Sequence, residues 1–222
     1  MTAMQNSPAA GVERRRDAER TRAEILDVAA AEFSERGYNG ARVDEIAART
    51  RTTKRMIYYY FGGKEQLYMA VLERAYTRIR AAEQAVEVDH LDPVTAIRRL
   101  AEITFDHHEA HPEFIRLVSI ENIHHAEHMA ELASLVDLSM PVIQLLDGIL
   151  KRGRDAGVFR ADVDAIDVHM MISSYCFFRV ANRDTFGSLF GRDLVDPAQH
   201  DRYRVMLGDM IVSYLTAGDR QP

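Results

Sequence analysis

Hydrophobic residues recur along this chain at steps of three and four, and no stretch alternates apolar and polar positions as a half-buried strand does. Such steps place apolar side chains on one face of a helix. The first predicted helix covers residues 18–36, where Ile25, Ala29 and Phe33 share a face, and Gly37 follows its end. We read about nine helices in all and therefore predict an all-α fold.

Two short helices and a long one come next. The pattern predicts helices over residues 43–49 and 53–60, joined by a tight turn at residues 50–52, and Gly62-Gly63 ends the second of them. The following helix is predicted over residues 64–86, and it is long enough to leave one domain and enter another.

The middle of the chain is divided by prolines. Asp92-Pro93 and His111-Pro112 are each predicted to start a helix, because proline is tolerated in a first helical turn. Apolar residues then step by three and four from Leu135 to Ile149. Pro141 lies inside that run and predicts either a kink or a later start of the helix.

The last two helices are predicted over residues 162–185 and 197–217, with a loop bearing Gly and Asp between them. The penultimate helix is apolar nearly all round, as expected for a helix that is buried on both sides. The final helix has one apolar face, formed by Tyr203, Leu207, Met210 and Tyr214.

The composition fits a globular protein, since 47% of the 222 residues are hydrophobic. The longest strongly apolar stretch, residues 168–178, is short of the roughly 20 residues that span a bilayer, so we expect no membrane segment. The N-terminus lacks the apolar core of a signal peptide, and we expect a cytoplasmic protein. A single cysteine, Cys176, excludes an internal disulfide.

Charge is distributed unevenly along a chain that is acidic overall, with a formal net charge of −6. Residues 1–60 hold 11 Lys and Arg against 9 Asp and Glu, a net of +2, whereas residues 61–222 hold 17 against 25, a net of −8. This asymmetry is modest, but it indicates that the N-terminal part meets a polyanion.

Residues 50–64 combine cations with four aromatic side chains. Two short helices joined by a tight turn fit a helix-turn-helix, whose second helix enters the major groove of DNA by its N-terminal residues. Thr53 suits the N-cap position, and Thr52 and Thr53 can donate hydrogen bonds to phosphates. Lys54 and Arg55 follow, where they can reach base edges, and Arg pairs bidentately with guanine.

The aromatic residues divide by helical geometry, since residues three or four apart share a face. Ile57 and Phe61 are predicted to point inward together. At least one of the three consecutive tyrosines must then point outward, where it can contact a phosphate or a thymine methyl group. These tyrosines are Tyr58, Tyr59 and Tyr60. Lys64, just past the Gly pair at a helix N-terminus, adds a further phosphate contact.

Residues 20–72 also follow a known pattern. It consists of the Ile-Leu and Ala-Ala pairs of the first helix, Phe33, Gly37-Tyr38, the Asp-Glu-Ile-Ala run at residues 44–47, Tyr58, Phe61, and Lys64-Glu65 followed by Leu67. This stretch resembles the N-terminal DNA-binding domain of the TetR/AcrR family of transcriptional repressors. The resemblance implies a helix-turn-helix head, a larger ligand-binding body and dimerisation through the last two helices. It implies DNA contacts by Thr52, Thr53, Lys54, Arg55, Tyr58, Tyr59, Tyr60 and Lys64.

Two positions depart from that family's pattern. The turn between the short helices has Thr50-Arg51 where the family commonly has a small residue and then glycine, so a left-handed conformation kept there would be strained. Arg42 stands where the family often has threonine, which weakens the helix cap and adds a cation near the DNA face. Both departures bear on the target sequence rather than on DNA binding itself.

The body carries fewer fixed signals, although the segments DPVTAIRRLAEITFDHHEA and HPEFIRLVSIEN are similar to the ligand-binding domain of RutR-like members of the family. A ligand cavity should have apolar and aromatic walls with a few polar groups, and Arg179 could bind a carboxylate there. Core packing is the alternative for each wall residue, and surface or dimer-interface hydrogen bonding is the alternative for Arg179. The candidate residues are Phe105, His108, Phe114, Met129, Met140, Tyr175, Phe178, Arg179 and Asn182.

Six of the nine histidines fall between residues 107 and 128. His124 and His128 have the i,i+4 spacing that places two imidazoles on one helix face, and His108 or His169 could complete a cation site with them. Zinc takes about four ligands, however, and no HExxH or paired-cysteine motif is present. We therefore favour hydrogen-bonded or solvated histidines and predict neither a metal nor a cofactor.

These features predict a disordered leader over residues 1–17, a helix-turn-helix domain over residues 18–64 and a ligand-binding and dimerisation domain over residues 65–222. The predicted function is a repressor that binds a pseudo-palindromic operator in double-stranded DNA as a homodimer and is released by a small-molecule effector. A ligand-independent architectural DNA-binding factor and a metal-sensing regulator are the alternatives. We do not expect an enzyme, because neither a nucleophile with a placed base nor a phosphate-binding loop is visible.

Overall fold

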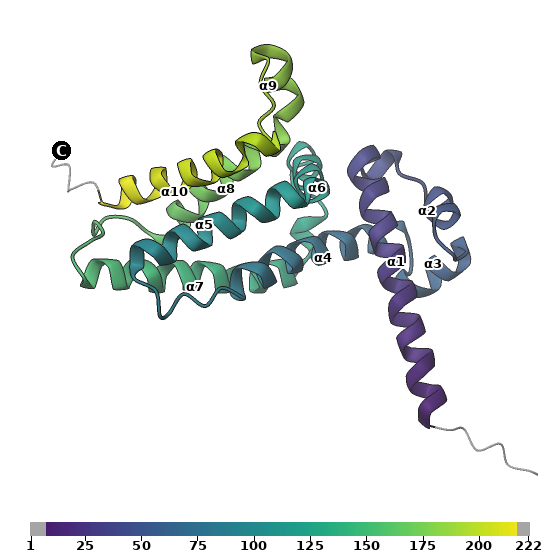
Figure 1. Ribbon diagram of the computed structural model, residues 1–222. Coiled ribbons are helices and arrows are strands. Elements are labelled where there is room, and N and C mark those ends of the chain that lie inside the picture. The colour runs from purple at the N-terminus through teal and green to yellow at the C-terminus, as the bar shows by residue number, and fades with distance from the viewer. Residues whose placement is uncertain (1–7, 217–222) are drawn as a thin grey trace, which may run out of the picture. The chain divides into compact units, whose positions relative to one another are not determined.

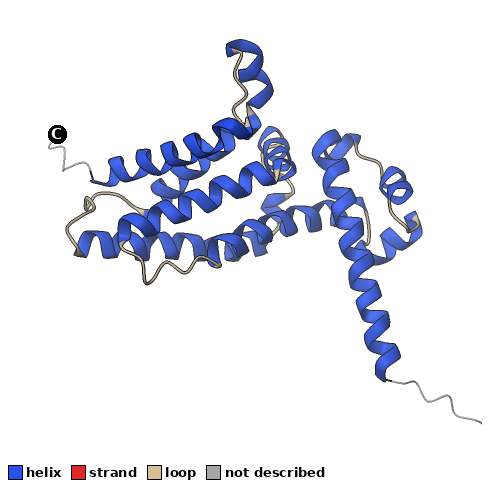
Figure 2. Ribbon diagram, in the orientation of Figure 1, coloured by secondary structure: helices blue, strands red, loops and turns tan. Residues whose placement is uncertain are grey.

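The computed structural model describes residues 8–216, and they form two compact units that divide in sequence between Leu72 and Glu73. Helices and their connecting loops make up both units (Figure 2). We call the first unit the head and the second the body. The domain boundary predicted after residue 64 lies eight residues before this division, at the start of the helix that crosses it.

The predicted ranges of the head's two short helices, 43–49 and 53–60, agree closely with the structure. The head is built from helices α1 Pro8–Gly40, α2 Val43–Arg49, α3 Lys54–Phe61 and α4 Lys64–Gln84, which Figure 1 labels. Only the first part of α4 belongs to the head.

Helix α1 is longer than its apolar pattern predicts, because it begins at Pro8 rather than at residue 18. Residues 8–17 of the expected disordered leader are therefore helical, and residues 1–7 lie outside the described part. Arg15 Nε lies 3.6 Å from Glu19 Oε1, and such i,i+4 ion pairs stabilise the exposed first part of this helix. Gly37, at φ 67°, then bends the chain at the position where the sequence predicts the helix to end.

The head has a small core of its own. The predicted inward face of α1, formed by Ile25, Ala29 and Phe33, is completely buried. The ring of Phe33 packs edge-on against Tyr68 of α4, with 4.9 Å between the ring centroids, and Tyr38 lies 5.2 Å from the same Tyr68 ring. This core fixes α1 and the start of α4 against each other.

The body continues α4 and adds six α-helices and two 3₁₀ turns to the described chain. They are α5 Pro93–Ala110, α6 Pro112–Ile123, η1 Met129–Glu131, α7 Ala133–Asp155, α8 Ala165–Ala181, α9 Arg183–Phe190, η2 Pro197–Gln199 and α10 His200–Thr216. Both predicted proline starts are confirmed, and Asp92 caps α5 by accepting from the backbone N–H groups of Val94 and Thr95.

The predicted number of about nine helices falls one short of the ten α-helices in the described residues. The helix predicted over residues 162–185 ends at Ala181, and the loop predicted after it contains α9, which projects from the rest of the body (Figure 1). Asn182 leaves the helical conformation, at φ −103° and ψ 11°, and its carbonyl accepts from Phe186 N–H as the next helix starts. One helix therefore ends and the next begins at Asn182. The spacing of apolar residues cannot reveal such a helix end.

Helix α5 is the central element of the body. It packs against α7, α8 and α10, and Figure 1 shows it running through the middle of this unit. The core that these helices share includes Ile97, Leu100, Phe105, Val168 and Leu207, each 1% exposed or less. Burial of side chains of this size stabilises the body by roughly 1.5–3 kcal/mol each.

Helix α7 continues through Pro141, where the sequence predicts a kink or a later start. Its buried face, which includes Val142, Leu146 and Ile149, extends the contact with α5 and α8 beyond the proline. By length and composition α7 is also the one described helix that could cross a membrane, a test that core helices of soluble proteins pass as well. Of the apolar window of α7, 28% is buried, and its buried face packs against α5 and α8.

Candidate DNA-binding surface and effector cavity

Helix α3 is held by a cap at its start and by a buried face along its length. The Thr53 hydroxyl accepts a hydrogen bond from Met56 N–H at 3.3 Å, so Thr53 is the N-cap that the sequence predicts. Ile57 is completely buried and Phe61 is 9% exposed, as helical spacing predicts. The orientation of α3 in the head is therefore fixed by its cap and its inner face.

The outer face of α3 carries the predicted DNA-contacting side chains. Lys54 and Arg55 are exposed, and Tyr59 is 78% exposed. Tyr58 is 40% exposed, whereas Tyr60 is half-buried and packs between Tyr59 and Phe61. The structure thus places Lys54, Arg55, Tyr58 and Tyr59 where a ligand of DNA size can reach them.

The two lysines of the head have partners within the protein. Lys54 Nζ lies 3.0 Å from Asp44 Oδ2 of α2, and this hydrogen bond raises the pKa of Lys54. Lys64 Nζ donates to the Asn39 carbonyl at 3.4 Å and lies 4.9 Å from the centroid of the Tyr38 ring. Partial burial lowers the pKa of Lys64. Asp44 is the partner with which a DNA phosphate would compete for Lys54.

The turn between α2 and α3 is relaxed. Thr50 has extended geometry, at φ −111° and ψ 162°, and no non-glycine residue of this turn has a positive φ. The Thr50 hydroxyl donates to the carbonyls of Ile46 and Ala47. The strain expected from Thr50-Arg51 is therefore absent, because the turn does not keep the left-handed conformation.

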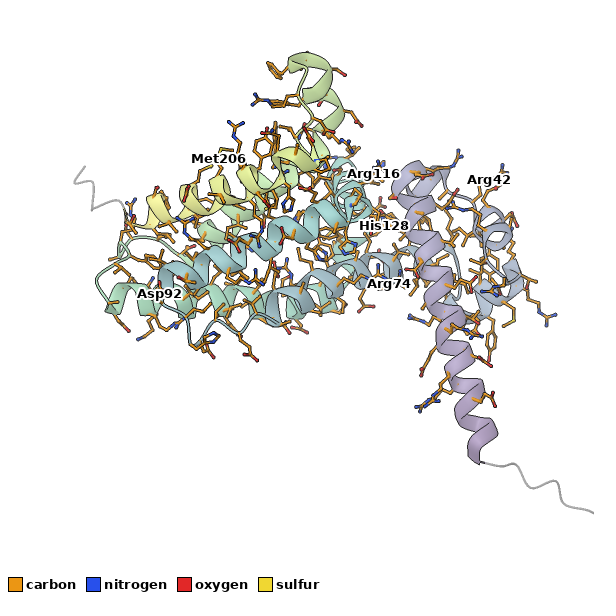
Figure 3. The ribbon with its side chains drawn as sticks, viewed as in Figure 1. Arg42, Arg74, Asp92, Arg116, His128 and Met206 are labelled. Atoms are coloured by element: carbon orange, nitrogen blue, oxygen red, sulfur yellow. The ribbon has the colours of Figure 1, made fainter. Side chains whose placement is uncertain are left out.

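Arg42 precedes α2 and provides no side-chain cap, as the sequence predicts. It is exposed and lies on the α2 side of the head (Figure 3). Its backbone N–H donates instead to Glu32 Oε1 of α1 at 3.3 Å. Thr52 is half-buried in the turn that follows α2, and Thr53 is exposed.

Glu32 is a structural residue of the head that the sequence pattern did not single out. It is 3% exposed and accepts from Arg49 Nη1 at 3.4 Å, and it lies 3.6 Å from Arg36 Nε. Together with its bond to the Arg42 backbone, these contacts tie α1 to both ends of α2. In the sequence, Glu32 stands one residue before Phe33 of the buried face. Nothing in the sequence pattern distinguishes it from an exposed glutamate.

A cavity of about 290 Å³ lies within the body between α4, α5, α6 and α8. Of the predicted pocket residues it brings together His108 of α5 and Phe114 of α6. The other residues that line it are Tyr76, Ile79, Arg80, Val118, Asn122, His169, Met170, Ser173, Ser174 and Phe177.

An ion pair is buried at the α4 wall of this cavity. Arg80 Nη1 donates to Glu83 Oε2 at 2.5 Å, and Glu83 Oε1 accepts from the Thr104 hydroxyl of α5 at 3.4 Å. Arg80 is 6% exposed and Glu83 is fully buried. Burial raises the pKa of Glu83, while Arg80 and Thr104 act in the opposite direction. The sequence contains a signal for this pair, because residues 76, 80 and 83 are spaced so that they lie on the same face of α4.

Three histidines of the body, His107, His108 and His169, are held neutral by burial. Burial lowers the pKa of His108 and of His169 to about 4, and that of His107 to about 3. Nδ1 of His108 lies 2.8 Å from the Thr104 carbonyl, which can only accept, so this nitrogen carries the proton. Its Nε2 is then a hydrogen-bond acceptor.

The remaining predicted pocket residues lie elsewhere in the body. Tyr175, Phe178 and Arg179 line a second hollow between α8 and α10. Arg179 is 3% exposed and donates to Glu109 and to the Leu194 carbonyl, so its guanidinium is occupied by the protein. Phe105 is fully buried in the core and Met140 is 46% exposed. Met129 contacts the Tyr76 hydroxyl, and Asn182 joins α8 to α9.

The two histidines considered for a metal lie after α6. His124 is exposed, and His128 Nδ1 lies 3.2 Å from Glu121 Oε1. Across residues 8–216, no group of three His, Cys, Asp or Glu residues is arranged to hold a metal ion.

Comparison with known proteins decides the family. The description "Bacterial regulatory proteins, tetR family" matches residues 25–71, and "Tetracyclin repressor-like, C-terminal domain" matches residues 93–211. The chain is 35% identical over 197 residues to the HTH-type transcriptional repressor NicS of Pseudomonas putida, covering 89% of this chain and 93% of NicS. The protein belongs to the TetR family of transcriptional regulators.

Further relatives agree with this assignment. The transcriptional regulator SCO4942 of Streptomyces coelicolor has a solved structure that superposes with a TM-score of 0.65 at 28% identity, covering 88% of this chain and 98% of SCO4942. RutR of Escherichia coli is 30% identical over 139 residues, which cover 60% of this chain and 64% of RutR. The chain is thus a soluble, DNA-binding transcriptional repressor of the TetR family, and this family is not one of enzymes.

Proposed function

We propose that this TetR-family protein acts in the cytoplasm as a homodimer that binds a pseudo-palindromic operator and leaves it when a small molecule occupies the body. The observation that carries the proposal is the arrangement of α3, whose inner face is buried at Ile57 and Phe61. This burial directs Lys54 and Arg55 outward at the start of the helix, and Tyr59 outward in its second half. A helix presented in this way can place its first turn in the major groove.

Each side chain of this face has a distinct proposed role. Arg55 reads a guanine edge, since its guanidinium matches the O6 and N7 acceptors of that base. Lys54 can reach a base edge or a neighbouring phosphate, and Tyr59 contacts the DNA backbone and fixes the position of the helix on the duplex. Arg42, Thr52, Thr53, Tyr58, Tyr60 and Lys64 complete the proposed contact surface.

Exposed apolar side chains of α8 and α10 support dimerisation of the body. One of them, Met206, lies on the outer side of α10 (Figure 3). A patch of exposed apolar side chains is unfavourable in water unless another surface covers it. A twofold dimer places two copies of α3 on one DNA duplex, so the symmetry of the protein predicts the symmetry of the operator. The exposed apolar residues of these two helices are Ile166, Met170, Phe178, Val205, Met206, Met210 and Tyr214.

Helix α4 supports the proposed coupling between effector and DNA. It begins in the head at Lys64, and its later residues Tyr76, Ile79 and Arg80 line the cavity of the body. An effector shifts the protein to a DNA-free state only through a difference in affinity for the two states, and a change from 99:1 to 1:99 requires about 5.5 kcal/mol. Contacts with α4 supply such a difference if α4 moves between the states.

Mobility-shift assays test the proposed DNA surface. Lys54→Ala and Tyr59→Ala should each weaken operator binding, while light scattering shows an intact dimer. Lys151→Ala is the matched control, because Lys151 is an exposed lysine of α7 paired with Asp155 and should leave operator binding unchanged. Unchanged binding in both head variants would contradict the assigned face.

Footprinting distinguishes the repressor from the ligand-independent alternative. A short symmetric footprint that disappears when a metabolite is added fits the proposed repressor. Diffuse coverage of the DNA that no small molecule changes would indicate an architectural DNA-binding factor instead.

A further inference from the structure

We propose that the cavity between α4, α5, α6 and α8 binds a small single-ring carboxylate, whose carboxylate group accepts hydrogen bonds from Arg80. This inference rests on the proposed function in taking that cavity as the effector site. It adds the chemical class of the ligand and the residue that recognises its charge.

The first observation is a donor without an acceptor. Nε of Arg80 is the one buried side-chain nitrogen or oxygen without a hydrogen-bond partner among the residues that the structure describes. A buried donor left unpaired is costly, and such groups in native proteins call for an explanation. Glu83 engages Nη1 of the same guanidinium, so the Nε edge is left for another acceptor. Because Arg80 is one of the residues that line the cavity, the proposal takes this edge as the group that a bound carboxylate reaches.

The second observation is the charge balance around the cavity. Arg80 is the one cation among the residues that line the cavity, and the side chains of His108 and His169 are neutral at pH 7. The other lining groups are hydroxyls, the Asn122 amide and apolar side chains. A single negative charge can therefore enter beside a guanidinium, whereas a second one would meet no further cation among the lining residues. This balance favours a monoanion.

The third observation concerns size and shape. A cavity of about 290 Å³ lies at the lower end of the roughly 300–1,000 Å³ range of ligand pockets, which fits a small ligand such as one ring with a carboxylate and a small substituent. Its walls include the rings of Tyr76, Phe114 and Phe177. Tyr76 and Phe114 already pack edge to face at 5.2 Å, and an aromatic ring can extend that arrangement.

His108 adds a preference for a substituent that donates. Its Nδ1 proton is committed to the Thr104 carbonyl, and its Nε2 is an acceptor at the cavity wall. A hydroxyl group on the ring would satisfy this acceptor. Hydroxybenzoates therefore match the lining groups better than benzoate does.

The test uses the full-length dimer and matched pairs of probes: benzoate and its three hydroxy derivatives, each beside the corresponding amide. Amides keep the ring and the shape but remove the charge. By calorimetry and thermal shift at pH 7.5, at least one carboxylate should bind at least about tenfold more tightly than its amide. Equal binding of acid and amide throughout the panel, or no carboxylate binding up to about 10 mM, would overturn the proposal.

A double variant assigns the preference to Arg80. Arg80→Met alone leaves Glu83 buried without a partner and can unfold the body, so Arg80→Met is combined with Glu83→Met, which removes both charges. The folded double variant should bind acid and amide equally, and a preference for the acid that persists in it would contradict the role of Arg80. Operator release is measured on the same samples. A carboxylate that binds through Arg80 without releasing DNA would refute the proposed effector response and leave this inference standing.

Discussion

Removing Arg80 should destabilise the body far more than removing an exposed arginine. In Arg80→Met the Glu83 carboxylate loses its ion-pair partner inside the protein and keeps only the hydrogen bond from Thr104, 3.4 Å away. Breaking a buried pair by deleting one partner costs about 3–5 kcal/mol. Because domains are stable by only about 5–15 kcal/mol in total, this variant should lose a large share of its free energy of unfolding.

Urea unfolding followed by circular dichroism at pH 7.5 measures this loss, and Arg99→Met provides the matched control. Arg99 is half-exposed, and its Nη1 lies 3.5 Å from Oε2 of Glu102. This pair has the same three-residue spacing as Arg80 and Glu83. Because the pair is exposed, removing Arg99 should cost no more than about 1 kcal/mol. The double variant Arg80→Met/Glu83→Met should recover most of the loss, because no charge is left unpaired in the interior. A loss below about 1 kcal/mol in Arg80→Met, or equal losses in the single and double variants, would refute the reasoning.

Three further predictions concern the head, the histidines and the dimer. Asp44→Asn should lower the raised pKa of Lys54 and free this side chain for phosphate, so operator binding measured by fluorescence anisotropy should tighten, and weaker binding would contradict the role of Lys54. His108 and His169 have pKa values lowered to about 4 from 6.5, so their contribution to stability is complete above pH 6.5 and is lost as the pH falls toward 4. The loss at pH 5.5 should be about 1.4 kcal/mol per histidine in urea unfolding, and a pH-independent stability would exclude it. Met206→Glu should separate the protomers in light scattering and weaken operator binding together, whereas an intact dimer would show that α10 is not the interface.

The head could be predicted from the sequence in considerable detail. Its helices are short, and each signal is local: Thr53 caps α3, Gly37 ends the regular part of α1, and the spacing of Ile57 and Phe61 sets the inner face. Glu32 was missed because its role depends on long-range contacts with the Arg42 backbone and Arg49. Interactions between segments distant in sequence leave no periodic trace.

The effector cavity was predicted less well, because apolar spacing identifies a buried face without telling core from cavity wall. Phe105 and Phe114 have equivalent patterns, yet the first lies in the packed core and the second lines the cavity. Arg179 was considered as a carboxylate-binding residue, with hydrogen bonding to protein groups as the alternative, and in the structure it donates to Glu109 and to the Leu194 carbonyl. Arg80 has a buried donor without a partner, and its place on the helix face shared by residues 76, 80 and 83 of α4 was the signal that could have identified it.

The most direct test of the account measures how Arg55 affects specific and non-specific DNA binding. An operator is first selected from random DNA with the wild-type dimer, and the affinities of wild type and Arg55→Ala are then compared on that operator and on unrelated duplex DNA at the same salt concentration. Loss of a bidentate guanine contact should cost about 1–3 kcal/mol per contact on the operator, and the variant should lose far less on unrelated DNA. Equal losses on both DNAs, or no loss on the operator, would contradict the claim that α3 reads bases through its exposed first turn.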